Sequence, residues 1–196
     1  MVSGWLEGIA FNNILWTLVQ KRLVLPVWSG SVELPEDAVV LEVGCGRGIG
    51  STIIMDAFKP SRIDAIDLDE RMVKKAQGYL HGEEYEDRIE VSCGDVSMLG
   101  GKADVYDAVF DFFTLKYVND WMKGLSEISR VLKPGGFFAF GELYGFEGNW
   151  LNVRSGRRFD RRQLVKALAE NNLRLMEAKR DLWGHGLVGV ARKATQ

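Results

Sequence analysis

The chain contains little cysteine and little histidine. Its 196 residues include only two of each. Cys45 and Cys93 are too few for a disulfide framework, and no cysteine or histidine spacing matches a zinc site. We therefore expect no metal ion, and a reducing, cytoplasmic location.

An excess of charge of one sign is also absent. The 25 basic and 27 acidic side chains leave a formal net charge of -2. This balance provides no general electrostatic attraction to nucleic acid or to anionic lipid. We therefore expect small-molecule partners and no nucleic acid, while the oligomeric state stays open.

Long uninterrupted apolar runs are missing as well. The N-terminal stretch is apolar, but Glu7, Asn12, Asn13 and Gln20 interrupt it. It also lacks the basic start and the small-residue cleavage site of a signal peptide. The sequence therefore predicts neither a signal peptide nor a stable membrane insertion.

The sequence does contain an alternation of strand and helix patterns. An apolar run broken only by Glu42 predicts a strand at residues 38–43, and alternation of apolar and polar residues predicts another at residues 88–92. Further strands are predicted at residues 63–67 and 107–110, and an aromatic-rich one at residues 137–142. Helical spacing predicts helices at residues 51–58, 72–80 and 121–132, with Lys133-Pro134-Gly135-Gly136 ending the last of these. After a further helix that begins near Asp160, residues 173–179 and 187–192 predict a closing strand pair. The chain should therefore form an α/β fold with a doubly wound, mostly parallel sheet and an antiparallel C-terminal strand pair.

A glycine-rich loop follows the first predicted strand. Gly44, Gly46 and Gly48 lie between that strand and the next helix, so the backbone can approach a ligand without a Cβ in the way. A nicotinamide-type fingerprint requires a third glycine five residues after the first, where this chain has Ile49. The spacing disfavours NAD, and an ordinary glycine-rich turn is the alternative interpretation.

The segment Glu42-Val43-Gly44-Cys45-Gly46-Arg47-Gly48 resembles the first motif of class I S-adenosylmethionine-dependent methyltransferases, of the type found in ubiquinone and menaquinone biosynthesis. Segments 65–72, 93–96, 106–111 and 132–136 resemble the following motifs in the family's order, so the resemblance covers residues 35–142. It implies a Rossmann-like methyltransferase fold of seven strands and S-adenosyl-L-methionine as cofactor.

The resemblance also implies how the cofactor is held. The glycine loop would cradle the methionine part, Asp67 would accept hydrogen bonds from the ribose hydroxyls, and Asp95 would accept one from the adenine amino group. Leu68 and Met72 would pack near adenine. The predicted cofactor-binding residues are Glu42, Gly44, Cys45, Gly46, Gly48, Asp67, Leu68, Met72, Gly94, Asp95, Val96, Asp111 and Phe112.

Catalytic residues should follow the carboxyl ends of the strands, where a doubly wound sheet binds its ligands. The predicted catalytic residues are Asp111, Tyr117 and Glu142. Asp111 is equally well explained as an acid that caps the following helix. Many relatives of the quinone-biosynthesis type carry a histidine pair where this chain reads Lys116-Tyr117, so no histidine base is carried over.

The N-terminal segment has three interpretations. Apolar side chains, among them Trp5, Phe11 and Trp16, spread over a broad arc of a helical wheel. In the family the segment before the first motif commonly packs over the active site, so residues 1–35 are predicted as a helical lid and residues 36–196 as the methyltransferase domain. Packing into the core is equally favoured. Peripheral membrane contact is a weaker third reading, since few basic residues lie nearby.

These features predict methyl transfer from S-adenosylmethionine to a small, apolar or aromatic acceptor by in-line displacement. Such a reaction depends mostly on alignment and on the electrostatic setting, so a dedicated base is optional. The alternative is a domain that binds the cofactor but has a regulatory or assembly role with little turnover.

Overall fold

The structure is a computed structural model that describes residues 14–143, 161–180 and 186–195. Its strands are β1 (Val39–Val43), β2 (Arg62–Asp67), β3 (Ile89–Cys93), β4 (Tyr106–Phe112), β5 (Leu132–Leu143), β6 (Leu173–Arg180) and β7 (Gly186–Lys193). The helices are α2 (Ile14–Val19), α3 (Leu25–Ser29), α4 (Ile49–Phe58), α5 (Glu70–Leu80), α6 (Trp121–Val131) and α7 (Arg161–Glu170), with shorter turns η1 (Gln20–Val24), η2 (Glu86–Arg88), η3 (Val96–Met98) and η4 (Leu115–Tyr117).

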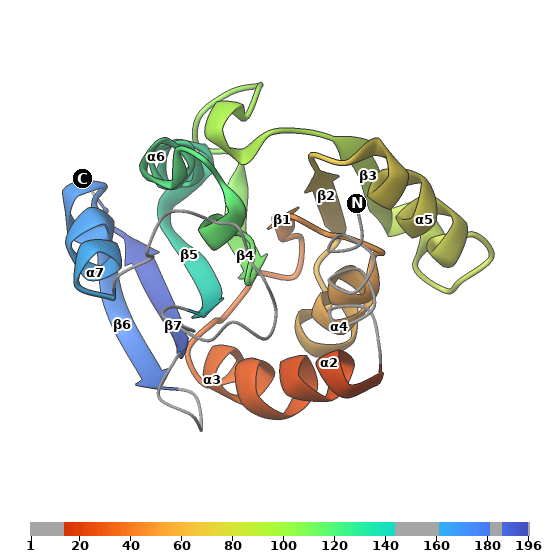
Figure 1. Cartoon of the computed structure of the whole chain (residues 1–196), viewed down its shortest axis with the longest axis horizontal. Coiled ribbons are helices and arrows are strands. Elements are labelled where there is room, and N and C mark those ends of the chain that lie inside the picture. Colours follow the sequence, from red (N-terminus) through yellow and green to blue (C-terminus); the bar gives the residue numbers. More distant parts are fainter. Residues whose placement is uncertain (1–13, 144–160, 181–185, 196) are drawn as a thin grey trace, which may run out of the picture.

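The strands form one seven-stranded sheet in the order β3-β2-β1-β4-β5-β7-β6 (Figure 1). Strands β1 to β5 pair in parallel, whereas β7 pairs antiparallel with both β5 and β6. The predicted doubly wound sheet with an antiparallel C-terminal pair is therefore confirmed. The strand order reverses direction at β1, so the loops after β1 and β4 meet at the position where such sheets bind ligands.

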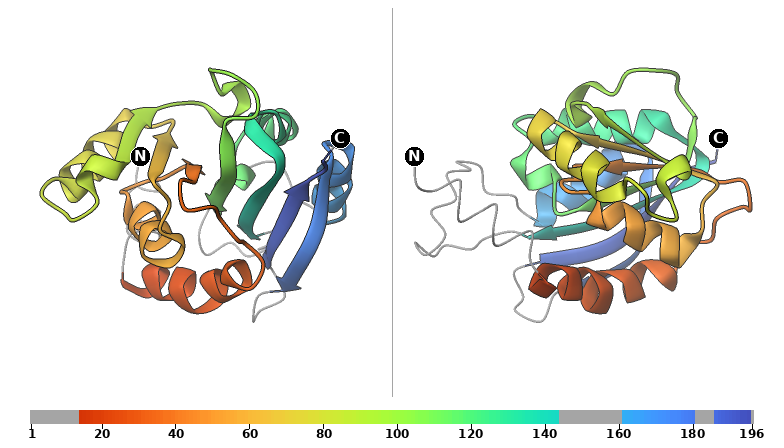
Figure 2. Two further views of the ribbon diagram at one scale, coloured as in Figure 1. Left: turned by 180° about the vertical axis from the view of Figure 1, so that it is seen from behind. Right: turned by 90° about the vertical axis from the view of Figure 1, so that its right-hand side faces the viewer.

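Helices cover both faces of the sheet (Figure 2). One core cluster joins the sheet to α3, α4 and α5, and a second joins the opposite face to α6 and α7. Helix α6 shows why the periodic sequence folds this way. Its apolar residues Trp121, Leu125 and Ile128 are buried, and the Asp120 carboxylate caps its first turn by accepting from the Lys123 backbone N–H at 3.2 Å.

The boundary between α6 and β5 differs from the sequence prediction. Helix α6 ends at Val131 and β5 begins at Leu132 with no intervening loop. Tyr106 pairs with Leu132, whereas Ala108 pairs with Phe137, so the segment that contains Pro134 forms an irregularity in the strand pair. Proline and glycine here stop the helix as predicted, but they bulge a strand that has already begun.

The helix before β1 continues through α2, η1 and α3 with one widened turn. The Leu25 backbone N–H donates to the Gln20 carbonyl, five residues back. The next residue, Pro26, has no N–H, and in a regular α-helix its ring would clash with the carbonyl of Arg22. A π turn at this point removes that conflict.

The end of this helix belongs to the core. Trp28 is fully buried, and its indole N–H donates to the Phe140 carbonyl at 3.3 Å. The Trp28 ring also lies 4.5 Å from that of Phe112. Trp5 and Phe11 lie outside the described residues. No helix in the described ranges is long and apolar enough to span a membrane.

Candidate cofactor site

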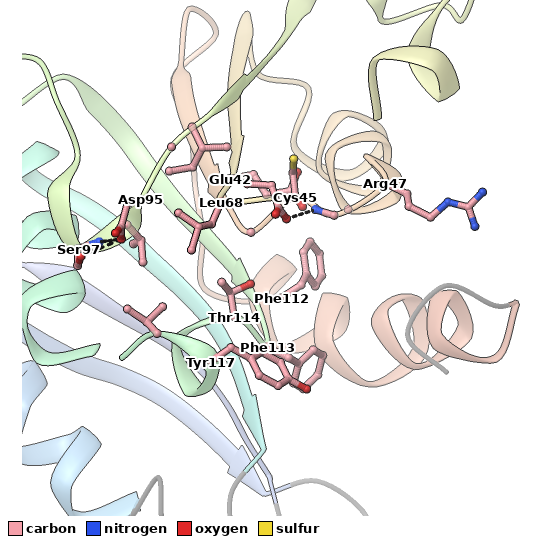
Figure 3. A pocket seen from close by; sticks show the side chains of 18 of the residues that line it. Glu42, Cys45, Arg47, Leu68, Asp95, Ser97, Phe112, Phe113, Thr114 and Tyr117 are labelled. Carbon is pink, nitrogen blue, oxygen red and sulfur yellow. Dashed lines mark hydrogen bonds between the residues drawn. The ribbon is translucent and has the colours of Figure 1, made fainter. Parts of the chain in front are cut away.

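A pocket of about 470 Å³ opens at the carboxyl ends of β1, β2, β3 and β4 (Figure 3). Loops that follow these strands form most of its wall, and the N-terminal helix closes one side. The lining residues are Thr17, Gln20, Glu42, Gly44, Cys45, Gly46, Arg47, Ile49, Gly50, Ile66, Asp67, Leu68, Gly94, Asp95, Val96, Ser97, Phe112, Phe113, Thr114, Tyr117, Val118, Asn119 and Asp120.

The glycine loop needs glycine for two different reasons. Gly44, Gly46 and Gly48 have φ angles of 68°, 56° and 84°, a region that side chains with a Cβ rarely adopt. A Cβ on Gly44 would lie 2.1 Å from the Thr114 hydroxyl oxygen, so this glycine serves packing within the protein. A Cβ on Gly46 would meet nothing within 4 Å. The backbone at Gly46 therefore faces open space that a ligand can occupy.

Asp67 links the end of β2 to this loop. Its Oδ2 accepts from the Gly46 backbone N–H and its Oδ1 accepts from the Asp69 backbone N–H, both at 2.9 Å. A carboxylate has about four lone-pair sites, so each oxygen keeps one for a further donor. Two neighbouring hydroxyl groups of a ribose are donors that fit this arrangement.

Glu42 lies at the floor of the pocket and is 1% exposed. The Ser51 hydroxyl donates to it, and a Cβ on Gly50 would lie 2.1 Å from its Oε1. Burial raises the pKa of the Glu42 carboxyl to about 7, against the opposing effect of the Ser51 hydrogen bond. The nearby Asp67 and Asp111 charges raise it further. A bound cation would reverse this effect, because it favours the ionised form.

Asp95 closes the far end of the pocket beyond β3. Its Oδ1 accepts from both the backbone N–H and the hydroxyl of Ser97, each at 2.8 Å. These two bonds fix the carboxylate as the cap of η3 while its second oxygen is not used by them. Leu68, 71% exposed, lines the neighbouring wall. An apolar surface next to a fixed acceptor suits a flat, amino-bearing ring such as adenine.

Aromatic side chains after β4 form the opposite wall. Figure 3 shows Phe113 and Tyr117 across the pocket from Glu42 and Leu68, whereas Phe112, the last residue of β4, lies beside Glu42 near Gly50. Phe113 has a φ of 66°, unusual for a bulky residue, and its backbone N–H donates to the Gly141 carbonyl at 2.8 Å. This turn redirects the chain from the strand into η4 and sets the Phe113 ring into the wall.

Most of the predicted site residues come together in this pocket. Those that line it are Glu42, Gly44, Cys45, Gly46, Asp67, Leu68, Gly94, Asp95, Val96, Phe112 and Tyr117. Four others do not line it. Gly48 begins α4 and packs against α5, since its added Cβ would lie 3.3 Å from that of Ala76. Met72 is half-buried on α5. Asp111 and Glu142 are fully buried beneath the wall.

Asp111 and Glu142 form a buried acid pair. The sequence predicts that both contact a ligand, but neither lines the pocket. Asp111 Oδ1 accepts from the Thr114 backbone N–H at 2.7 Å. Asp111 Oδ2 and both Glu142 carboxyl oxygens accept no donor among the described residues. Burial raises the pKa of both groups. A proton held between the two carboxyls pairs one oxygen of each, because one carboxyl then donates to the other.

Several residues that line the pocket were not predicted from the sequence. Gln20 is 7% exposed and reaches the pocket from the N-terminal helix, and Thr17 lies one turn before it. A polar side chain on an otherwise apolar helix face is the sequence signal for Gln20. Thr114, whose hydroxyl donates to the Val43 carbonyl at 3.2 Å, carries no such signal. Its place depends on the turn at Phe113.

Cys45 lines the pocket but is not suited to nucleophilic chemistry. Burial raises the pKa of its thiol, and the Glu42 and Asp67 charges add to this effect. The thiol therefore stays protonated at neutral pH. Within the described ranges, no group of three or more histidine, cysteine or acidic residues could hold a metal ion.

The fold and this pocket define the chain as a Rossmann-like domain that binds a nucleoside-type cofactor. The sequence profile of a family described as methyltransferase domain matches residues 41–140, more than half of the chain. The chain therefore belongs to this methyltransferase family, and its resemblance to class I S-adenosylmethionine-dependent enzymes is confirmed.

Curated relatives match only over part of their length. A demethylmenaquinone methyltransferase from Clavibacter sepedonicus is 33% identical over 125 residues, which are 64% of this chain and 46% of the relative. A malonyl-[acyl-carrier protein] O-methyltransferase from Priestia megaterium is 28% identical over 105 residues, 54% of this chain and 36% of the relative. The chain thus spans about half or less of the length of these relatives.

Solved structures agree in fold over nearly the whole chain. A SAM-dependent methyltransferase from Aquifex aeolicus superposes with a TM-score of 0.76 at 18% identity, and the match covers 96% of this chain and 97% of that one. A geranyl diphosphate C-methyltransferase from Streptomyces coelicolor, solved with S-adenosyl-L-homocysteine, gives a TM-score of 0.74 at 17% identity and covers 86% and 75%.

Proposed function

We propose that this protein transfers the methyl group of S-adenosylmethionine to a small, apolar or aromatic acceptor. The observation that carries the proposal is the Gly46–Asp67 arrangement. The backbone at Gly46 faces open space, and the Asp67 carboxylate is held beside it by a hydrogen bond. Both lie where the strand order reverses, opposite an aromatic wall. When bound, the cofactor supplies an electrophilic methyl group on a positively charged sulfur.

Different pocket residues would bind different parts of the cofactor. The backbone at Gly44 and Gly46 would lie beside the methionine part of the cofactor. Glu42 would supply negative charge near the ammonium group of that part. Asp67 would hold the ribose. Leu68, Gly94, Asp95 and Val96 would surround adenine. We propose no direct contact for Gly48, Met72 or Asp111, because each lies outside the pocket lining.

The acceptor would lie against Phe113 and Tyr117. These rings provide an apolar surface on which a flat ring system can stack. The named substrates of the relatives, demethylmenaquinone and a malonyl-[acyl-carrier protein], differ in kind. The aromatic wall favours the first type, and we therefore propose a quinone-like or other aromatic acceptor.

The N-terminal segment would complete this site. Thr17 and Gln20 already line the pocket from α2 and η1. We propose that residues 1–35 act as a cover whose far end, at Trp28, is anchored in the core, and that residues 36–196 form the catalytic domain. Cys45 and Cys93 are free thiols, which fits the reducing cytoplasm that we propose as its location.

Calorimetry with purified protein tests the cofactor. We expect S-adenosylmethionine and S-adenosylhomocysteine to bind and NAD not to bind. Asp67→Ala should weaken S-adenosylhomocysteine at least about tenfold, because a charge-assisted hydrogen bond is lost. Asp87→Ala, an exposed acid on η2, is the matched control and should bind normally. Tight NAD binding, or unchanged affinity in Asp67→Ala, would contradict the assignment.

Turnover separates an enzyme from a binding-only domain. The protein would be incubated with S-adenosylmethionine and a panel of reduced naphthoquinones and phenols, and S-adenosylhomocysteine would be quantified. Release that depends on the acceptor supports methyl transfer. Cofactor binding without any release across the panel would favour a regulatory or assembly role instead.

A further inference from the structure

Gln20 is a buried polar side chain in the wall of the pocket. It is 7% exposed and lines the pocket from η1. Its side-chain amide makes no hydrogen bond with any residue that the structure describes. The amide is not sealed in the protein either, as the Glu142 oxygens are, so the surface that it keeps faces the pocket. A buried amide without a partner is rare and costs stability, and a ligand in the pocket would supply the missing partner.

The helix backbone at Gln20 has an unusual shape. The Gln20 carbonyl accepts from the Leu25 backbone N–H, so η1 begins at Gln20 as a single widened turn. Single turns of this kind recur at functional sites. Thr17 lies three residues earlier, on the same face of the helix, and also lines the pocket. The helix thus brings an amide and a hydroxyl, both neutral hydrogen-bond donors, to the same cavity.

These two donors lie at the methionine end of the proposed cofactor site. Figure 3 shows the N-terminal helix, in pale red, at the end of the pocket opposite Asp95 and Ser97. Asp95 is the proposed adenine contact. The ring of Phe112, which lies beside Glu42, is 4.5 Å from that of Trp28 on the N-terminal helix. The helix therefore borders the part of the pocket that contains Glu42.

The described wall of the pocket is acidic. Glu42, Asp67, Asp95 and Asp120 all line it. Among the lining residues in the described ranges, Arg47 is the one with a basic side chain, and Figure 3 shows its guanidinium extending away from the pocket. A ligand carboxylate bound here would therefore depend on neutral donors, because an anion that leaves water without any donor loses much of its affinity.

Two other hydroxyl groups of the wall are already engaged. The Ser97 hydroxyl donates to Asp95 at 2.8 Å, and the Thr114 hydroxyl donates to the Val43 carbonyl at 3.2 Å. A hydroxyl has a single O–H, so neither group can donate to a ligand at the same time. The Gln20 amide has two N–H donors and makes no such bond, which leaves it able to bind a carboxylate oxygen.

We propose that Gln20, together with Thr17, binds the carboxylate of the methionine part of the cofactor. This inference rests on the proposed function. S-adenosylmethionine carries its ammonium and its carboxylate on the same carbon atom, so a carboxylate next to an ammonium that faces Glu42 meets the N-terminal helix. The segment before the glycine loop is then part of the cofactor site. Cofactor binding would fasten this helix to the pocket before an acceptor binds.

A pair of ligands that differ only in the carboxylate tests this assignment. Calorimetry would measure the affinities of S-adenosylhomocysteine and of its decarboxylated form, S-adenosyl-3-thiopropylamine. We expect wild type to bind the decarboxylated form at least about tenfold more weakly. Gln20→Met, similar in shape but without a donor, should lose about tenfold in affinity for S-adenosylhomocysteine and bind the decarboxylated form as wild type does. Gln163→Met, at an exposed position of α7, should match wild type with both ligands.

A second variant and a second measurement guard against a folding defect. Gln20→Asn keeps a polar amide but withdraws it by one methylene group, so it should show the same selective loss. Hydrogen exchange would report on the helix directly. S-adenosylhomocysteine should slow amide exchange in residues 17–24 of the wild type, and the decarboxylated form should slow it less. Gln20→Met should show equal exchange with the two ligands.

The possible outcomes separate the two proposals. Failure of the wild type to bind either ligand would overturn the proposed function. Equal wild-type affinities for the two ligands would overturn the carboxylate site alone. Wild-type affinity for S-adenosylhomocysteine in both Gln20 variants would also overturn it, and so would an equal loss for both ligands in both variants. If Arg47→Met removes the dependence on the carboxylate and Gln20→Met does not, the arginine is the ligand and the assignment is wrong.

Discussion

The Ser51 hydroxyl donates a hydrogen bond to Glu42, a carboxyl group with 1% exposure on the floor of the pocket. Burial raises the pKa of Glu42 from its ordinary value of 4.5 to about 7. The folded protein therefore holds a proton on Glu42 at pH values where the unfolded chain has lost it. Stability must then fall as the pH rises through this window.

We expect Glu42→Gln to remove this pH dependence. Stabilisation from the protonated Glu42 is fully present below pH 4.5 and is lost above pH 7, and the difference amounts to about 3 kcal/mol. Glutamine stays neutral and can still accept from Ser51. The variant should thus gain stability relative to wild type as the pH rises from 5 to 8, measured by urea unfolding. A constant difference between the two proteins would contradict the raised pKa.

Cofactor binding should release a proton from the same group. The ammonium of the methionine part favours an ionised neighbour, so Glu42 should lose its proton when S-adenosylhomocysteine binds at pH 6. Calorimetry in phosphate and in an amine buffer at that pH would reveal this as a buffer-dependent heat. Glu42→Gln should show the same heat in both buffers. Equal heats for wild type would exclude the linkage.

Comparing Gly46→Ala with Gly82→Ala should separate the loss of folding stability caused by a left-handed backbone from a loss of cofactor affinity. Gly46 and Gly82 both have positive φ angles, 56° and 78°, and an added Cβ meets nothing within 4 Å at either position. Each alanine variant should lose about 1–2 kcal/mol of unfolding free energy because of the left-handed backbone. Only Gly46→Ala should also weaken S-adenosylhomocysteine, by tenfold or more, or about 1.4 kcal/mol. Similar affinities in the two variants would remove Gly46 from the site.

Gly50→Ala and Gly78→Ala form a second matched pair, both in helices. A Cβ on Gly50 would lie 2.1 Å from Glu42 Oε1 and 2.9 Å from the Phe112 ring, whereas one on Gly78 would meet nothing within 4 Å. We expect Gly50→Ala to destabilise by about 1–3 kcal/mol through overpacking. Gly78→Ala should stabilise by about 0.5–1 kcal/mol, the helix propensity difference. Denaturant unfolding of both variants would check these opposite signs, and a Gly50→Ala variant as stable as wild type would refute the close packing.

The sequence predicts the sheet well because its signals are local. An apolar run broken only by Glu42 marks β1, and the spacing of Trp121, Leu125 and Ile128 marks α6. The motif acids reach the pocket because Asp67 is the last residue of β2 and Asp95 lies two residues after β3, and the carboxyl ends of both strands face the pocket. These positions depend only on the strand ends, which sequence patterns can locate.

Other features depend on contacts between distant segments. Asp111 and Glu142 share the sequence context of site residues, yet they pair with each other beneath the wall because β4 and β5 are neighbours in register. Gly48 packs on α5 and does not line the pocket. Gln20 reaches the pocket only because Trp28 anchors its helix near β5. Local sequence patterns do not determine the register of neighbouring strands. They also do not predict the contact between Trp28 and Phe140, which are 112 residues apart in the chain.

The position of β7 inside the sheet has a consequence for synthesis on the ribosome. Because β7 lies between β5 and β6, β6 has no partner strand and β5 is paired only with β4 until residues 186–193 have been made. Until then β5 presents an unpaired edge that includes Phe138 and Phe140, both fully buried in the finished fold. Such an edge is prone to aggregate, so the emerging chain should depend on chaperone holding or on rapid completion of translation.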